Sequence, residues 1–108
     1  MNEKRHVEVE GYISKITNCF NSGVVTNLLL NTCRGRFALD LCQRFHPAEL
    51  MFSERENHFG SLIDGVVYDV CGNVTNRYGW EPWTAFAARK PKEADRIYHT
   101  VILLEDVA

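Results

Sequence analysis

Aromatic and basic side chains are concentrated in one segment, residues 77–96, with the sequence RYGWEPWTAFAARKPKEADR. The segment holds both tryptophans of the chain, Trp80 and Trp83. Rings exposed to water are costly unless they cover or bind something. Aromatic faces interleaved with cations are typical of single-stranded nucleic-acid binding, in which bases stack on the rings and phosphates contact the charges. The segment therefore predicts a nucleic-acid interface.

The charge of this segment differs from that of the rest of the chain. The whole chain has 12 Lys and Arg against 14 Asp and Glu, a formal net charge of −2. Residues 77–96 hold five basic and three acidic side chains, a net of +2, so the remainder is net acidic. Because the salt dependence of binding follows the number of neutralised phosphates, this small excess predicts modest, salt-sensitive affinity.

Alternation of apolar and polar residues predicts β-strands over most of the chain. Residues 7–16 alternate cleanly, and Gly11 near their centre is typical of a bulge at the corner of a barrel. Residues 47–57 are the helix candidate, because Pro47 suits a first helical turn. The expected strands cover residues 7–16, 24–32, 36–42, 66–74 and 98–107, and Arg34-Gly35 is the expected turn between the second and third.

Three strands, a helix and two strands give the order β-β-β-α-β-β, which is that of the OB-fold barrel. A chain of 108 residues has the length of one domain. We therefore expect a single all-β domain over residues 1–108, a five-stranded barrel with one helix. That fold binds ligands on strands two and three and with the loops after strands one and four. Residues 77–96 would form the loop after strand four.

Short motifs along the chain resemble the OB-fold single-stranded DNA-binding proteins, including the short primosomal replication proteins. The matching segments are VEVEGYISKI, LLLNT, RFALDLCQRF, GVVYDVCGNVTNRYGW and HTVILLEDV. The resemblance implies a non-catalytic protein that binds single-stranded DNA with little sequence preference during replication, repair or recombination. It also implies a homodimer, which extends the groove, and contacts with replication or recombination proteins.

The predicted nucleic-acid-binding residues combine the aromatic segment with the expected first loop and hairpin. The resemblance places Trp80 and Trp83 against bases, Arg36 on the ligand side of the hairpin, and Lys15 near the mouth of the first loop. The full set is Lys15, Phe20, Arg34, Arg36, Arg77, Tyr78, Trp80, Trp83, Arg89, Lys90 and Lys92.

Other interpretations of the same residues stay open. The tryptophans serve equally well to cover the end of the barrel or to form a dimer contact, because tryptophan is enriched at interfaces. An interaction module that holds a peptide or a partner subunit is the main alternative. Single-stranded RNA is another, because base stacking does not distinguish RNA from DNA.

Catalysis, metal binding and membrane insertion have weaker signals. The four cysteines form no C-x-x-C pair, so we expect reduced thiols, no metal site and no cofactor. The best catalytic set, Cys42, His46 and Asp40, matches no nucleophile motif, and we expect no enzyme. The N-terminal MNEKRHVEVEG lacks the apolar region of a secretory signal, and no apolar run is long enough to span a bilayer. The expected location is the cytoplasm.

Overall fold

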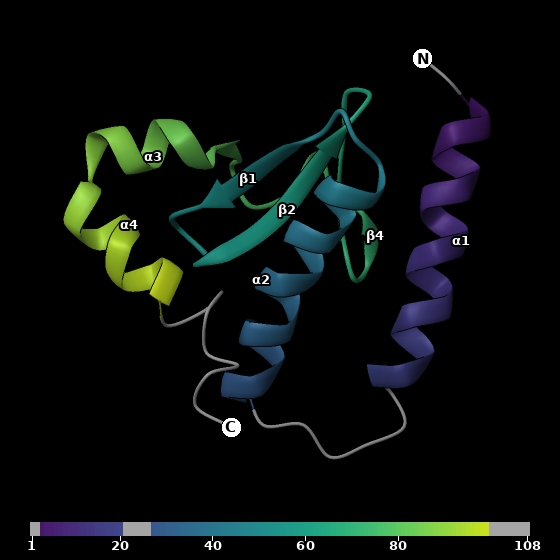
Figure 1. The fold of residues 1–108 in the computed structure, drawn as a ribbon, viewed down its shortest axis with the longest axis horizontal. Helices are drawn as coiled ribbons and strands as arrows, with labels where there is room; N and C mark the ends of the chain where they lie inside the picture. The colour runs from purple at the N-terminus through teal and green to yellow at the C-terminus, as the bar shows by residue number, and fades with distance from the viewer. Residues whose placement is uncertain (1–2, 21–26, 100–108) are drawn as a thin grey trace.

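The computed structural model describes residues 3–20 and 27–99, and within them the side chains of residues 3–15 and 35–99. Two long helices come first, followed by a sheet and two short helices (Figure 1). The elements are α1 (Glu3–Phe20), α2 (Asn27–Arg44), β1 (Glu49–Ser53), β2 (His58–Ile63), β3 (Val66–Asp69), β4 (Gly72–Asn73), β5 (Glu81–Pro82), α3 (Trp83–Arg89) and α4 (Pro91–Ile97).

The five strands form one antiparallel sheet in the order β4-β3-β2-β1-β5. The expected number of strands, five, is confirmed, although most of the strands are formed by other residues than expected. The predicted all-β barrel is not what the described residues form. The sheet is open, with the two-residue strands β4 and β5 at opposite edges, and four helices accompany it. The element order β-β-β-α-β-β is wrong.

The first expected strand, residues 7–16, lies within helix α1. Buried Val9 and Ile13 are four residues apart, which places them on one face of a helix. Half-buried Tyr12 lies beside them, whereas Val7 is 68% exposed. Apolar residues in this segment recur both every two residues, as in a strand, and about every 3.6 residues, as in a helix. In the structure the segment is helical, and the helix buries Val9 and Ile13.

The third expected strand, residues 36–42, and the expected turn at Arg34-Gly35 lie within helix α2. Phe37, Ala38 and Leu41 are buried at the i, i+1, i+4 spacing of a helix. Residues 27–32 of the second expected strand are also helical, and residues 24–26 lie outside the described residues. The expected hairpin therefore does not form.

The expected helix at residues 47–57 is instead strand β1 and the turn that follows it. Met51, Phe52 and Ser53 are all buried in succession, which is typical of a strand covered on both faces. The expected strand at 66–74 is confirmed in part, as β3 and β4 joined by a turn. Of the last expected strand, residues 98 and 99 continue the helical turn after α4, and residues 100–107 lie outside the described residues.

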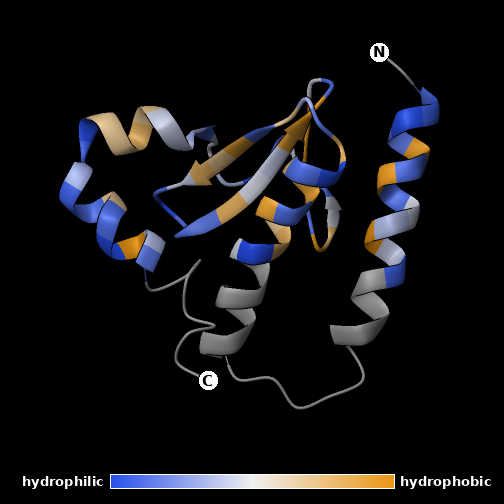
Figure 2. Ribbon diagram, in the orientation of Figure 1, coloured by the Kyte–Doolittle hydropathy of each residue, from blue (hydrophilic) through white to orange (hydrophobic). Residues whose placement is uncertain are grey.

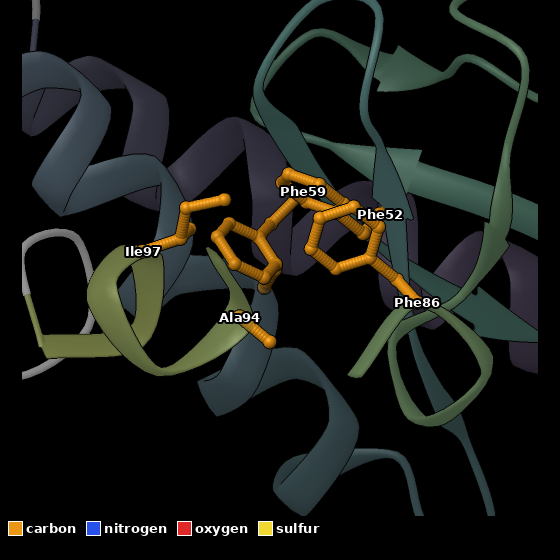
Figure 3. Packing of buried hydrophobic residues seen from close by; sticks show 6 residues of the cluster. Phe52, Phe59, Phe86, Ala94 and Ile97 are labelled. Carbon is orange, nitrogen blue, oxygen red and sulfur yellow. The ribbon is translucent and has the colours of Figure 1, made fainter. Parts of the chain in front are cut away.

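Side chains from both faces of the sheet are buried. On one face, aromatic residues of β1 and β2 pack against α3 and α4, in a cluster that includes Phe52, Phe59 and Phe86 (Figure 3). On the same face, Val9 of α1 and Leu41 of α2 pack near Tyr68 of β3. Figure 2 shows hydrophobic residues on the central strands and in short bands on α1. A third buried cluster, Met51, Val67 and Val74, lies on the opposite face.

Candidate functional site

A histidine and an aspartate on neighbouring strands form a buried pair. The Nε2 atom of His58 on β2 lies 2.6 Å from Oδ2 of Asp69 on β3. The two side chains are 8% and 3% exposed. The second carboxylate oxygen, Oδ1, accepts the backbone N–H of Cys71 at 2.7 Å. Both oxygens of Asp69 are therefore bonded, and one ring nitrogen of His58 is held in place.

The pair faces away from α1 and α2. Successive side chains of a strand point to opposite faces of the sheet. Ser61 of β2 donates to the backbone oxygen of Ala38 on α2 at 2.5 Å, and Tyr68 of β3 packs in the cluster of α1 and α2. His58 is an odd number of positions from Ser61, and Asp69 is next to Tyr68, so both members of the pair lie on the other face of the sheet.

Two aromatic residues cover the pair. The rings of Tyr78 and Trp80 lie with their centroids 4.8 Å and 5.8 Å from that of His58. They contact each other edge to face at 5.4 Å, and the indole N–H of Trp80 donates to the backbone oxygen of Val74 at 2.9 Å. This arrangement encloses the His58 ring between the sheet and two aromatic side chains.

Gly60 makes room for this cover. A Cβ atom at Gly60 would lie 2.7 Å from Cγ1 of Val67 and 3.0 Å from Cη2 of Trp80. Cβ atoms essentially never show a contact of 2.7 Å, and one of 3.0 Å requires the neighbour to shift, so glycine lets Val67 and the indole lie directly on the sheet. The position of the Trp80 ring therefore depends on a residue twenty positions earlier in the chain.

Trp83 begins α3 and packs onto the sheet on the other face. Its ring centroid lies 5.2 Å from that of Phe52, 5.1 Å from that of Phe59 and 5.5 Å from that of Phe86. Trp83 is half-buried by these contacts. Three of the four aromatic residues in the predicted binding set, Tyr78, Trp80 and Trp83, thus cover parts of the protein's own sheet.

Acidic side chains pair with two of the predicted phosphate-binding cations. The Arg89 guanidinium lies 2.5 Å from Glu81 and 3.5 Å from Glu54. Lys90 also pairs with Glu54, and this contact holds the pKa of the Glu54 carboxyl below its usual range. Two more predicted cations, Arg77 and Lys92, are exposed.

The remaining predicted site residues lie on helices. Lys15 is exposed on α1, and Phe20 ends that helix. Arg34 and half-buried Arg36 belong to α2, so the placement of both on a hairpin is wrong. The side chains of Phe20 and Arg34 lie outside the described residues.

Cys42, His46 and Asp40, the best catalytic set in the sequence, each have different surroundings in the structure. Oδ2 of Asp40 accepts the Tyr12 hydroxyl at 2.5 Å. Cys42 lies beside the Ser61 hydroxyl, and burial raises the pKa of its thiol. His46 is exposed in the turn after α2. These three residues point to no shared site.

Sequence reasoning missed the His58–Asp69 pair because it placed His58 after a helix and Asp69 on the outer face of a strand. The signal was present in Asp64-Gly65, since Asp-Gly between apolar runs is typical of a β-hairpin turn. A hairpin folded there pairs Ser61 with Tyr68, the observed register. That register brings His58 and Asp69 to one face.

Comparisons with protein-family models, with characterised proteins and with solved structures find no match. No group of three or more His, Cys, Asp or Glu side chains within the described segments is placed to hold a metal ion. No helix among residues 3–20 and 27–99 is long and apolar enough to cross a membrane.

Proposed function

We propose that the protein is an enzyme of the hydrolase or acyltransferase class in which His58 is the general base and Asp69 orients it. The observation that carries the proposal is the buried 2.6 Å contact between His58 Nε2 and Asp69 Oδ2. A base held by a carboxylate is the recurring arrangement of nucleophilic active sites. The sequence alone favoured a protein without catalysis, and this contact is the reason for the different proposal.

The chemistry follows from the two ring nitrogens. When the Nε2 proton is donated to Asp69, the lone pair of Nδ1 is left to accept a proton from a nucleophile. No hydrogen bond from the described side chains or backbone to Nδ1 of His58 is observed. The Asp69 carboxylate fixes the tautomer and stabilises the imidazolium that forms after proton transfer.

A cysteine is the nucleophile that we assign to this base. Ser53, the register partner of His58, carries a hydroxyl, but this residue is fully buried and donates to the backbone oxygen of Tyr78. The chain has four cysteines, of which Cys71 is exposed, follows Asp69 by two residues and lines a cavity beside Ile13 and Ser14 of α1. A thiol becomes strongly nucleophilic when a neighbouring histidine takes its proton.

The proposal is tested with p-nitrophenyl acetate. The sulfur attacks the ester carbonyl, its proton passes to His58, p-nitrophenolate leaves, and water then hydrolyses the thioester. We expect a burst of p-nitrophenolate with a covalent acetyl adduct visible by intact mass, and a loss of at least about 100-fold in His58→Ala. His46→Ala is the matched control, because His46 is exposed and lies outside the pair.

The outcome is decided by the two histidine variants together. Absence of a burst in the wild type, or a burst that survives in folded His58→Ala, would show that the pair is only structural. Asp69→Asn offers a second folded variant, because its side-chain oxygen can still accept the Cys71 N–H. It should also reduce the burst, since the amide cannot hold the tautomer that leaves Nδ1 free.

Single-stranded DNA binding is a second candidate, supported by one groove. Trp83 and Tyr98 line an open cavity of about 280 Å³ between α3 and α4. Asp95 also lines the cavity, and Lys92 is exposed on the same helix, α4. Titration of tryptophan fluorescence with oligo-dT at two salt concentrations tests it. Salt-sensitive quenching would support nucleic acid, a flat signal would favour a peptide in the same groove, and competition with a matched RNA would separate DNA from RNA.

A further inference from the structure

We propose that Tyr78 is a gate over His58 that also positions its ring, and that Ser53 is the latch which keeps this gate closed. Four features of the described residues carry the inference: a strained backbone at Tyr78, a ring contact, a buried hydroxyl and two fixed ends. The gate rests on the proposed function in one respect only, which is that the molecule it admits to His58 is a substrate.

The backbone at Tyr78 is held in an unfavourable conformation. Its φ is 70°, a value at which side chains other than glycine are strained, and Gly79 follows at φ 68°. The N–H of Gly79 donates to the backbone oxygen of Arg77 at 2.9 Å. A three-residue turn in which the N–H of the third residue bonds to the oxygen of the first is a γ-turn, and a positive φ at its central residue marks the rarer, strained form. Such strain gathers at active sites, ligand clamps and switch segments, and it persists only where neighbouring contacts enforce it.

One enforcing contact comes from Ser53. This residue lies on β1, opposite His58 in the register, and it is fully buried. Its hydroxyl donates to the backbone oxygen of Tyr78 and accepts the backbone N–H of Glu56 at 3.3 Å. Strands β1 and β2 thus place His58 beside the Ser53 hydroxyl, which holds the backbone of Tyr78.

The segment between Val74 and Trp80 is built to pivot. Val74 is buried, and its backbone oxygen accepts both the Trp80 indole N–H and the backbone N–H of Arg77. Between these fixed ends, Thr75 and Tyr78 are half-buried, and Asn76, Arg77 and Gly79 are exposed. The residue that contacts His58 is therefore the inward point of an exposed turn.

These features give Tyr78 two states with different consequences for His58. With the Ser53 bond formed, the Tyr78 ring lies 4.8 Å from the imidazole and helps to leave that side chain only 8% exposed. With the bond broken, relief of the γ-turn lets the ring leave and uncovers the imidazole. A substrate that takes the place of the ring would find the base already oriented by Asp69.

Carbethoxylation by diethyl pyrocarbonate measures access to each histidine without requiring catalysis. Peptide mapping by mass spectrometry gives the modification rate of His58 beside those of exposed His46 and His99. The set is wild type, Ser53→Ala, Tyr78→Ala, Tyr78→Phe and the double variant of Ser53→Ala with Tyr78→Ala. Ser61→Ala is the matched control, since Ser61 is equally buried and also donates to a backbone oxygen, but on the opposite face.

We expect His58 to react at least about tenfold more slowly than His46 in the wild type, because only the open state is modified. Ser53→Ala should raise the His58 rate about fivefold, the population change that one lost hydrogen bond produces. Tyr78→Ala should raise it at least as much, whereas Tyr78→Phe and Ser61→Ala should leave it unchanged. In the Tyr78→Ala background, Ser53→Ala should add nothing, because both act through one gate.

Either of two results would overturn the gate. One is an unchanged His58 rate in Ser53→Ala, and the other is an equal, additive effect of Ser53→Ala in the Tyr78→Ala background. The second would mean that Ser53 acts through the turn at Glu56 and not through Tyr78. An absent ester burst together with the expected modification rates would remove the proposed function and leave the gate standing.

Discussion

His58 and Asp69 contact each other at 2.6 Å on a sheet face that also buries three apolar side chains and the hydroxyl of Ser53. Met51, Val67 and Val74 lie on that face, and Trp80 covers them. A buried polar group without its partner loses solvation and gains nothing in return. Each member of the pair is therefore tolerable only in the presence of the other, which makes the pair costly to lose and sensitive to substitution.

Asp69→Ala should destabilise the fold by about 2–6 kcal/mol, because it leaves two donors, the His58 ring N–H and the Cys71 backbone N–H, without an acceptor at about 1–3 kcal/mol each. Asp69→Asn should cost less, about 1–3 kcal/mol, because an oxygen remains for the Cys71 N–H. Urea denaturation followed by far-UV circular dichroism gives both values. Equal costs for the two substitutions would show that the bond to Cys71 does not contribute.

Gly60→Ala should destabilise the protein by about 1–3 kcal/mol, because the new methyl group overpacks Val67 and the Trp80 ring. Gly11→Ala is the opposite case, since nothing lies within 4 Å of the added Cβ and the position is inside α1. It should stabilise the helix by roughly 0.5–1 kcal/mol. Thermal unfolding of the two variants should shift the midpoint in opposite directions, and a shift in the same direction would contradict the packing at Gly60.

The sheet was predictable where local turn chemistry fixes the pairing. Asp64-Gly65 has the sequence of a two-residue hairpin, and the strands around it are β2 and β3. The helices were not, because residues 7–16 and 36–42 fit an alternating pattern as well as a helical one. Tertiary packing decides between them. A strand would place Val7 on the same face as Val9 and Ile13, whereas the helix buries Val9 and Ile13 with half-buried Tyr12 beside them and leaves Val7 exposed.

The candidate site was partly predictable for a similar reason. The aromatic residues of the segment at 77–96 were identified as unusual, and Tyr78 and Trp80 do cover the pair. Their role depends on residues far away in the sequence, above all on Gly60 and His58. Because the expected strands did not include these two residues, their contacts with Trp80 and Tyr78 could not be predicted. Residue type indicated that the rings need something to cover, but only the strand pairing identifies what they cover.

Trp83→Ala separates a packing role from a role in base stacking. Because the ring packs on Phe52, Phe59 and Phe86, its removal should destabilise the fold by roughly 3 kcal/mol. A residue that only stacked on bases would leave stability unchanged and weaken oligo-dT binding by about 1–3 kcal/mol. Chemical denaturation and an oligo-dT titration of the same variant give both numbers. Unchanged stability would contradict the packing described for α3.

Glu54→Gln tests the ion pairs that join α3 to the turn after β1. Lys90 lowers the pKa of Glu54, so this contribution to stability is present above the ordinary carboxyl pKa and is lost as the pH falls through the lowered value. At neutral pH and low salt, the variant should unfold at a lower temperature than the wild type. The difference should shrink in high salt, because both partners are largely exposed.

Glu56→Gln is the control for that measurement. Glu56 is also in the turn after β1, but its partner is the adjacent Arg55, so it joins no separate elements. It should leave the midpoint unchanged at either salt concentration. A salt-independent loss of stability in Glu54→Gln would point to lost packing instead of lost charge.

The rate at which iodoacetamide alkylates the chain's fastest cysteine tests the central claim most directly. The measurement is made near pH 6 in wild type, His58→Ala and His46→Ala, with the modified residue mapped by mass spectrometry. An ordinary thiol is thiolate in only about one molecule in 300 at this pH, whereas a thiol that has given its proton to His58 remains reactive. The account predicts one thiol at least about tenfold faster than the others, and loss of that advantage in His58→Ala only. Four cysteines that react slowly and alike, or a fast thiol unaffected by His58→Ala, would contradict it.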